Sequence, residues 1–144
     1  MSVTESVRLE QVVLGNFQGA LPMKDFRSLV VWQKAHSLAL ASYRATRGFP
    51  KQETYGLSSQ IRRCAASVAA NMAEGCGRRG NGEFHRFLNI AAGSASELEY
   101  HFLLARYLTL LEDGEYQELN RGVVEIRRML GALITKVNAE RFAS

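Results

Sequence analysis

Apolar residues near the end of the chain follow the clearest periodic pattern in the sequence. Seven of them are separated by alternating steps of three and four residues: Tyr116, Leu119, Val123, Ile126, Leu130, Leu133 and Val137. Such steps place side chains along one face of a helix, as in the seam of a coiled coil. The pattern therefore predicts an amphipathic helix over about residues 114–139, with Asp113 as the expected N-cap residue.

Three more segments are predicted to be helical, over about residues 25–47, 54–78 and 83–111. The first ends just before Gly48 and Pro50, and the second is rich in alanine and ends near Gly75. The third, for which Asn81 is a candidate N-cap, carries apolar residues around much of its circumference. A helix of that kind is expected to be buried on more than one side, which predicts a subunit interface in a protein of this size.

Four helices joined by short connections pack as antiparallel neighbours. The expected fold is therefore all-α, an antiparallel up-down-up-down four-helix bundle over residues 23–144. Residues 1–22 contain Gly15, Gly19 and Pro22 and do not continue the helical pattern. We expect this N-terminal extension to be either a tail or a partner-docking segment.

Composition agrees with a single globular domain, because 47% of the 144 residues are hydrophobic and 22% are charged. There is no run of 18 apolar residues and no basic segment followed by an apolar one at the N-terminus. A cytoplasmic protein without a membrane segment is expected. Cys64 and Cys76 belong to no CxxC motif, so we expect two reduced thiols packed as small apolar groups.

Positive charge is concentrated in one part of the chain. Residues 23–86 hold eleven Lys and Arg against four acidic residues, whereas the whole chain has a net charge of +4. An antiparallel bundle would gather Lys24, Arg27, Arg78, Arg79 and Arg86 at one end, and place Arg44, Arg47 and Lys51 near the start of the second helix. The candidate nucleic-acid-binding residues are Lys24, Arg27, Arg62, Arg63, Arg78, Arg79 and Arg86. A basic face that binds nothing remains the alternative.

No motif for catalysis or metal binding stands out in the sequence. His36, His85 and His101 match no HExxH or ExxH pattern, and no Ser, His and Asp set suggests a catalytic triad. The glycine-rich segment 75–82 follows a helix and lacks the Gly-Lys-Ser/Thr end of a phosphate-binding loop. We therefore predict no catalytic residue, no metal ligand and no cofactor. Six polar residues within the second and third helices are expected either to pair across them or to lie at the interface edge: Gln60, Ser67, Asn71, Glu74, Ser94 and Glu97.

Several sequence blocks resemble one known family. The first is Asp25 to Ala35, followed by Phe49-Pro50 and by Gln60-Ile61-Arg62-Arg63. Two more specific blocks read SVxANxAEG over residues 67–75 and AxGSxxELE over residues 91–99. Over residues 23 to about 137 the chain resembles the four-helix bundle proteins known as the 23S rRNA intervening-sequence protein family.

This resemblance implies an antiparallel four-helix bundle without known enzymatic activity. The family is also similar to the accessory variability determinant of diversity-generating retroelements, a basic homopentameric barrel that binds nucleic acid and a reverse transcriptase. The first functional hypothesis is thus a non-enzymatic homo-oligomer, expected to be a pentamer, that binds structured RNA through arginine–phosphate contacts. The alternative is a protein–protein adaptor, such as a reverse transcriptase accessory subunit, with residues 1–22 as a docking segment.

Overall fold

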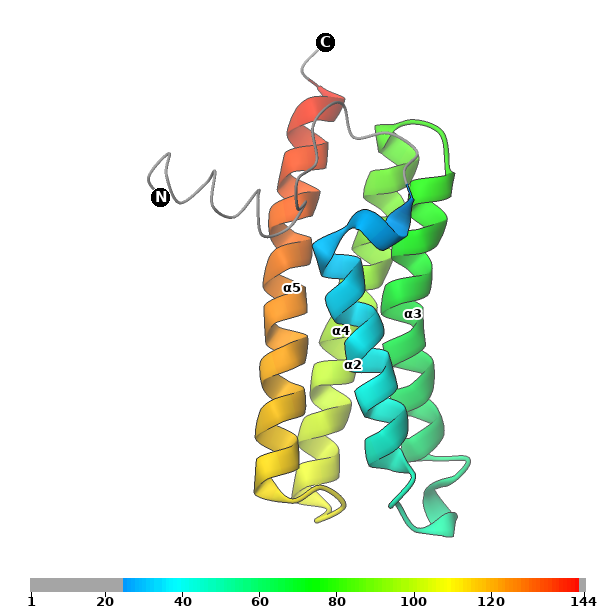
Figure 1. The fold of residues 1–144 in the computed structure, drawn as a ribbon, viewed down its shortest axis with the longest axis vertical. Helices are drawn as coiled ribbons and strands as arrows, with labels where there is room; N and C mark the ends of the chain where they lie inside the picture. The colour runs from blue at the N-terminus through cyan, green and yellow to red at the C-terminus, as the bar shows by residue number, and fades with distance from the viewer. Residues whose placement is uncertain (1–24, 143–144) are drawn as a thin grey trace.

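The computed structural model describes residues 25–142, and they form four long helices. The helices are α2 (Val30–Thr46), α3 (Leu57–Gly77), α4 (Asn81–Tyr107) and α5 (Asp113–Arg141), with short 3-10 turns η1 (Phe26–Ser28) and η2 (Lys51–Glu53). Figure 1 shows the long helices side by side, with successive helices running in opposite directions. No strand occurs in this part of the chain, so the predicted all-α four-helix bundle is confirmed.

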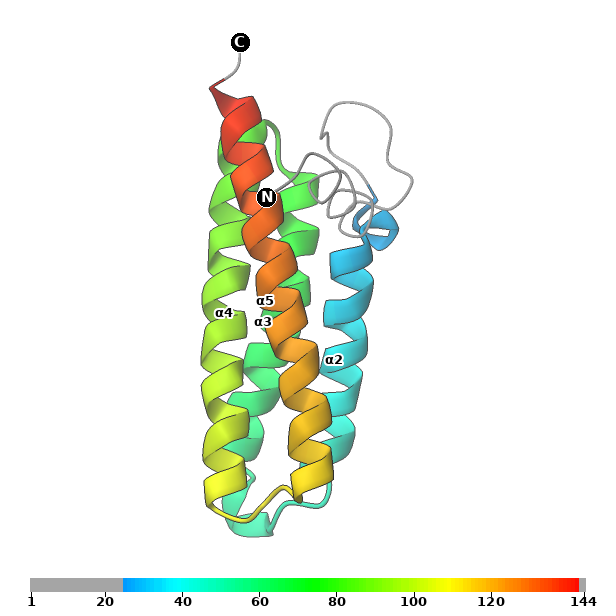
Figure 2. The ribbon, with the colours of Figure 1, turned by 90° about the vertical axis from the view of Figure 1, so that its left-hand side faces the viewer.

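Each long helix packs mainly against two others. The helix α4 lies between α3 and α5, and α2 contacts both α3 and α5 on the remaining side. Figure 2, turned by 90°, shows the same four helices from the side. None of the helices in residues 25–142 has an apolar stretch of the length that crossing a bilayer requires.

The core contains the apolar residues that the periodic patterns select. Six of the seven seam residues of α5 are buried: Leu119, Val123, Ile126, Leu130, Leu133 and Val137. Tyr116, at the start of the seam, is only partly buried. Phe102 of α4 and Met72 of α3 are fully buried among them, so the α3–α4–α5 contacts form one continuous core.

The predicted helix ends shift where a local side chain or backbone conformation stops the helix. The first segment opens as the turn η1, because the Asp25 carboxylate accepts a hydrogen bond from the Arg27 backbone N–H at 3.0 Å. The second helix begins at Leu57 rather than residue 54, since the Glu53 carboxylate caps the Leu57 N–H at 3.0 Å. The third ends at Tyr107 rather than residue 111, because Thr109 adopts a left-handed backbone with φ of 60°.

The expected N-cap positions are also off by one residue. Gly80, with φ of 83°, caps α4, and Asn81 is its first residue. Glu112 is the N-cap residue of α5, and Asp113 lies in the first turn. The negative charge of Asp113 interacts favourably there with the positive end of the helix dipole. Residues 1–22, expected to be a tail or docking segment, lie outside the described residues.

Candidate nucleic-acid interface

The candidate arginines lie at two places on the bundle. Arg27, Arg78, Arg79 and Arg86 lie at the end where α3 passes into α4, the upper end of Figure 1, as the antiparallel arrangement predicts. Arg62 and Arg63 lie on α3, 16 residues before Arg78 and Arg79 respectively, which is about 24 Å along the helix. Lys24 lies outside the described residues.

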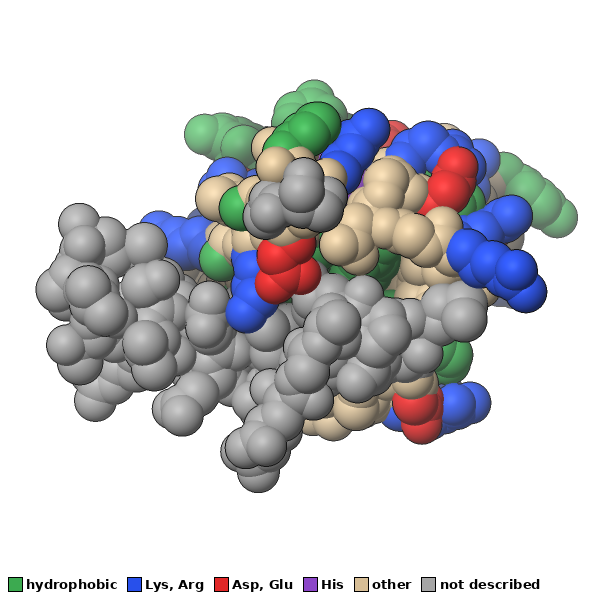
Figure 3. All heavy atoms as spheres, turned by 90° about the horizontal axis from the view of Figure 1, so that it is seen from above, with side chains coloured by type: hydrophobic (Ala, Val, Ile, Leu, Met, Phe, Trp, Pro, Cys, Tyr) green, Lys and Arg blue, Asp and Glu red, His purple; other side chains and the backbone are tan. Residues whose placement is uncertain are grey.

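At the upper end, three arginines are paired with carboxylates from their own segment. Arg27 lies 3.1 Å from Asp25, Arg78 lies 2.8 Å from Glu74, and the third pair is Arg86 with Glu83 at 3.2 Å. Figure 3 looks down on this end and shows blue basic side chains interrupted by red acidic ones. Pairing compensates much of the positive charge here, so this end attracts a phosphate less than the arginine count suggests.

Arg78 and Arg86 also share one aromatic ring. Their guanidinium carbons lie 5.4 Å and 4.4 Å from the centroid of the Phe87 ring. Cation–π contacts of this kind stabilise the side-chain positions. Together with the carboxylate pairs, they give these two arginines a structural role at the α3–α4 connection.

The opposite end carries a cleft with a different charge balance. The cleft measures about 690 Å³ and lies between the end of α2, the turn η2 and the start of α3. Four cationic residues line it: Arg47, Lys51, Arg62 and Arg63. None of its lining residues is acidic, and Thr46, Thr54, Ser58 and Ser59 add hydroxyl groups. We call this surface the basic cleft.

Neutral partners hold the two arginines of α3 in the basic cleft. Arg62 donates from Nε to Thr46 Oγ1 at 2.8 Å, and its guanidinium lies 4.8 Å from the Tyr43 ring centroid. Arg63 donates from Nη2 to Gln60 Oε1 at 2.6 Å. Because these partners carry no charge, the guanidinium groups are oriented without being neutralised, and several of their donors remain open.

The turn before α3 brings the remaining cations to the cleft. Phe49 is buried and anchors the chain after α2, which leaves Arg47 and Lys51 exposed on either side of it. Gly56 allows the Glu53 carboxylate to approach α3, since a Cβ there would lie 2.9 Å from Glu53 Oε2. No ion pair joins Arg47 or Lys51 to any residue within 25–142.

Sequence reasoning placed Arg47 and Lys51 near the start of the second helix but did not include them among the site residues. It also missed Tyr55, whose side chain borders the basic cleft and is 96% exposed. A signal for these residues was present, because basic and aromatic residues alternate through the connection from Arg47 to Tyr55. The sequence does not show that Arg47, Lys51 and Tyr55 lie beside Arg62 and Arg63, because that depends on the path of the connection between α2 and α3.

Of the polar residues expected to pair between α3 and α4, Ser67 and Ser94 do so, whereas Asn71 pairs within α3. The hydroxyls of Ser67 and Ser94 lie 2.9 Å apart, and Asn71 donates to Ser67 Oγ at 2.9 Å. The cysteines are free and buried, also as predicted. The fold nevertheless places Glu97 and His101 beside Cys64, a grouping that sequence spacing did not indicate.

The fold and this cleft define the molecule as an all-helical four-helix protein with a basic, acid-free cleft at one end. A model of the 23S rRNA-intervening sequence protein family matches residues 27–132. The chain belongs to the 23S rRNA-intervening sequence protein family.

One solved structure from Bacteroides thetaiotaomicron, a protein with unknown function from the S23 ribosomal protein family, is similar. It shares 28% sequence identity and a TM-score of 0.67 with this chain. The match covers 73% of this chain and 98% of the Bacteroides chain. A comparison with curated proteins finds no match.

Proposed function

We propose that this protein is a non-enzymatic, homo-oligomeric bundle that binds structured RNA in the basic cleft. The observation that carries the proposal is the set of four cations, Arg47, Lys51, Arg62 and Arg63, in a cleft without an acidic lining residue. Guanidinium groups match phosphate oxygens with paired hydrogen bonds, and backbone contacts of this type account for most affinity for nucleic acids.

Other groups in the basic cleft suit RNA better than a small anion. Tyr55 is 96% exposed, so its ring can stack on an unpaired base, whereas the Tyr43 ring already holds the Arg62 guanidinium over one face. The surrounding hydroxyls can hydrogen-bond to phosphate or ribose oxygens. Single-stranded loops of a structured RNA offer both bases and phosphates to such a surface.

Self-assembly is the second part of the proposal. Three large apolar side chains on one face of α4 are exposed, at i, i+3 and i+7 spacing: Tyr100 at 57%, Leu103 at 38% and Tyr107 at 78%. A row of exposed apolar residues on one helix is typical of an interaction surface. We propose that copies of the chain pack through this row, and the resemblance to a pentameric barrel favours five copies. Repetition would multiply a moderate single-cleft affinity through avidity.

The test compares two triple variants that remove the same charge from opposite ends. The cleft variant carries Arg47→Gln, Lys51→Gln and Arg63→Gln, and leaves Arg62 with its structural contacts. The matched control carries Arg27→Gln, Arg78→Gln and Arg86→Gln at the upper end. Affinity for a structured RNA is measured over a series of salt concentrations, with light scattering on the same samples.

Wild type should bind with an affinity that falls steeply with salt. The cleft variant should bind weakly, and its slope of log K against log salt should be shallower by roughly 2–3, about 0.7–0.9 for each lost phosphate contact. The control should retain most of the wild-type affinity. Equal losses in both variants would overturn the cleft assignment. A wild-type oligomer that is indifferent to RNA would overturn the RNA proposal and favour the adaptor hypothesis, and a wild-type monomer would overturn self-assembly.

A further inference from the structure

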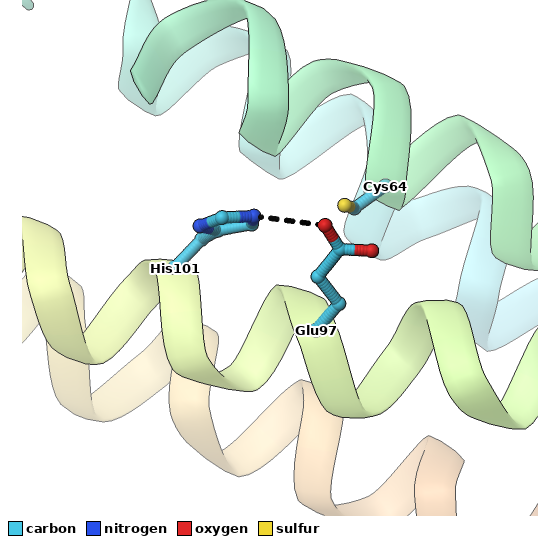
Figure 4. Close-up of side chains that lie close together, drawn as sticks. All are labelled: Cys64, Glu97 and His101. Atoms are coloured by element: carbon cyan, nitrogen blue, oxygen red, sulfur yellow. Dashed lines mark hydrogen bonds and ion pairs between the residues drawn. The ribbon is translucent and has the colours of Figure 1, made fainter. Parts of the chain in front are cut away.

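Three potential metal ligands meet between α3 and α4, outside the basic cleft and outside every site described above. Cys64 comes from α3, and Glu97 and His101 lie one turn apart on α4. Figure 4 shows the Glu97 carboxylate between the cysteine sulfur and the imidazole ring. One ligand atom from each residue lies within 4.8 Å of the other two.

The spacing of these atoms is close to that of a tetrahedral zinc site. His101 Nε2 lies 3.4 Å from Glu97 Oε1. A nitrogen and an oxygen ligand, each about 2.1 Å from a tetrahedral zinc ion, are about 3.4 Å apart. A thiolate ligand would lie about 3.6 Å from either, so the cysteine sulfur needs to approach by about 1 Å at most. The Glu97 side chain can adjust, because it is 56% exposed.

We propose that Cys64, Glu97 and His101 bind one Zn²⁺ ion between α3 and α4. Sulfur, imidazole nitrogen and carboxylate oxygen are the three ligand types that zinc takes in proteins. Three protein ligands leave the fourth tetrahedral position to water or another ligand, on the side that the exposed Glu97 opens to solvent.

The contacts around His101 leave its Nε2 available to a metal ion. His101 Nδ1, the ring nitrogen that does not contact Glu97, is buried and has no hydrogen-bond partner among residues 25–142, so no neighbour draws the ring into another orientation. Its Nε2 makes only a long contact to Glu97, which a metal bond would replace with a much stronger interaction. The nearby Arg63 guanidinium opposes a cation, although it is directed to Gln60.

Zinc binding requires the Cys64 thiol to give up its proton. The bound ion displaces that proton: a zinc–sulfur bond forms, the sulfur–hydrogen bond breaks, and the proton passes to the buffer. Metal affinity should therefore rise with pH, with a release of about one thiol proton for each ion.

The experiment titrates the purified, metal-stripped protein with Zn²⁺ against a competing chelator, and repeats the titration with Co²⁺. Wild type should bind one Zn²⁺ per chain, and Co²⁺ should produce the near-ultraviolet absorption of a cobalt–thiolate bond. Cys64→Ala, Glu97→Gln and His101→Gln should each lower Zn²⁺ affinity by at least about tenfold. Cys76→Ala is the matched control, because Cys76 is the other buried cysteine of α3 and should leave binding unchanged.

Glu97→Gln keeps the result interpretable if the buried variants do not fold, since this side chain is largely exposed. Wild-type affinity no tighter than that of Glu97→Gln, or an equal loss in Cys76→Ala, would overturn the inference. The inference does not depend on the proposed RNA function, and the titration contains no RNA.

Discussion

Gly75 offers a direct test of how closely α3 and α4 approach each other. It is buried in the last turn of α3, opposite two phenylalanines of α4. A Cβ at this position would lie 2.9 Å from Phe87 Cβ and 3.1 Å from Phe84 Cδ1. The first distance is shorter than a carbon–carbon contact allows, and it involves an atom directly attached to the α4 backbone. Gly75→Ala should therefore force the two helices apart.

The magnitude follows from two opposing terms. Overpacking of this kind costs about 1–3 kcal/mol of unfolding free energy. Alanine is favoured over glycine within a helix by about 1 kcal/mol, and by less near a helix end. The net expectation for Gly75→Ala is a loss of up to about 2 kcal/mol.

Gly131 supplies the matched control. It is exposed within α5, and a Cβ there would meet no atom within 4 Å. Gly131→Ala should show the helix-propensity term alone, a gain of about 1 kcal/mol. The difference between the two variants should then be at least the overpacking cost of about 1–3 kcal/mol.

Guanidinium chloride unfolding, followed by far-ultraviolet circular dichroism at one fixed protein concentration, measures both variants. The midpoint should fall for Gly75→Ala and rise for Gly131→Ala, with unchanged slopes. If Gly75→Ala stabilises the protein as much as Gly131→Ala does, the close approach of α3 and α4 is wrong.

Two further predictions concern the core. In the metal-stripped protein, burial raises the pKa of Cys64 and Cys76 to about 11 from an ordinary value of 9.0. The free energy of unfolding that the protonated thiols contribute is therefore complete below pH 9 and is lost between pH 9 and about 11. Each thiol adds at most about 1.4 kcal/mol per pH unit to that loss. A Cys64→Ala, Cys76→Ala double variant should lose stability less steeply over this range, and equal slopes would contradict the assignment. Phe102→Ala, at a side chain that is 0% exposed, should cost about 3–5 kcal/mol in chemical unfolding. A cost under about 1 kcal/mol would contradict this packing.

The fold could be predicted because its signal is local and repetitive. The buried face of α5 could be predicted from spacing alone, because each apolar residue of the seam is three or four positions from the next. Short connections then leave antiparallel packing as the simplest arrangement. The exact helix ends were less predictable, because they depend on single side chains such as the Glu53 carboxylate that caps Leu57.

The sites depend on contacts that spacing does not encode. Glu74 lies four positions before Arg78, so helical spacing alone allows that pair, whereas the threonine hydroxyl that Arg62 reaches belongs to α2. Cys64 and His101 are 37 positions apart, and they meet only because α3 and α4 pack in one particular register. The sequence by itself therefore determined the four helices, their buried faces and the excess of positive charge, all of which follow from local periodicity and composition. Only the tertiary structure decided which residues of α2 surround Arg62 and which potential metal ligands meet, because both depend on the rotation and relative shift of helices distant in the chain.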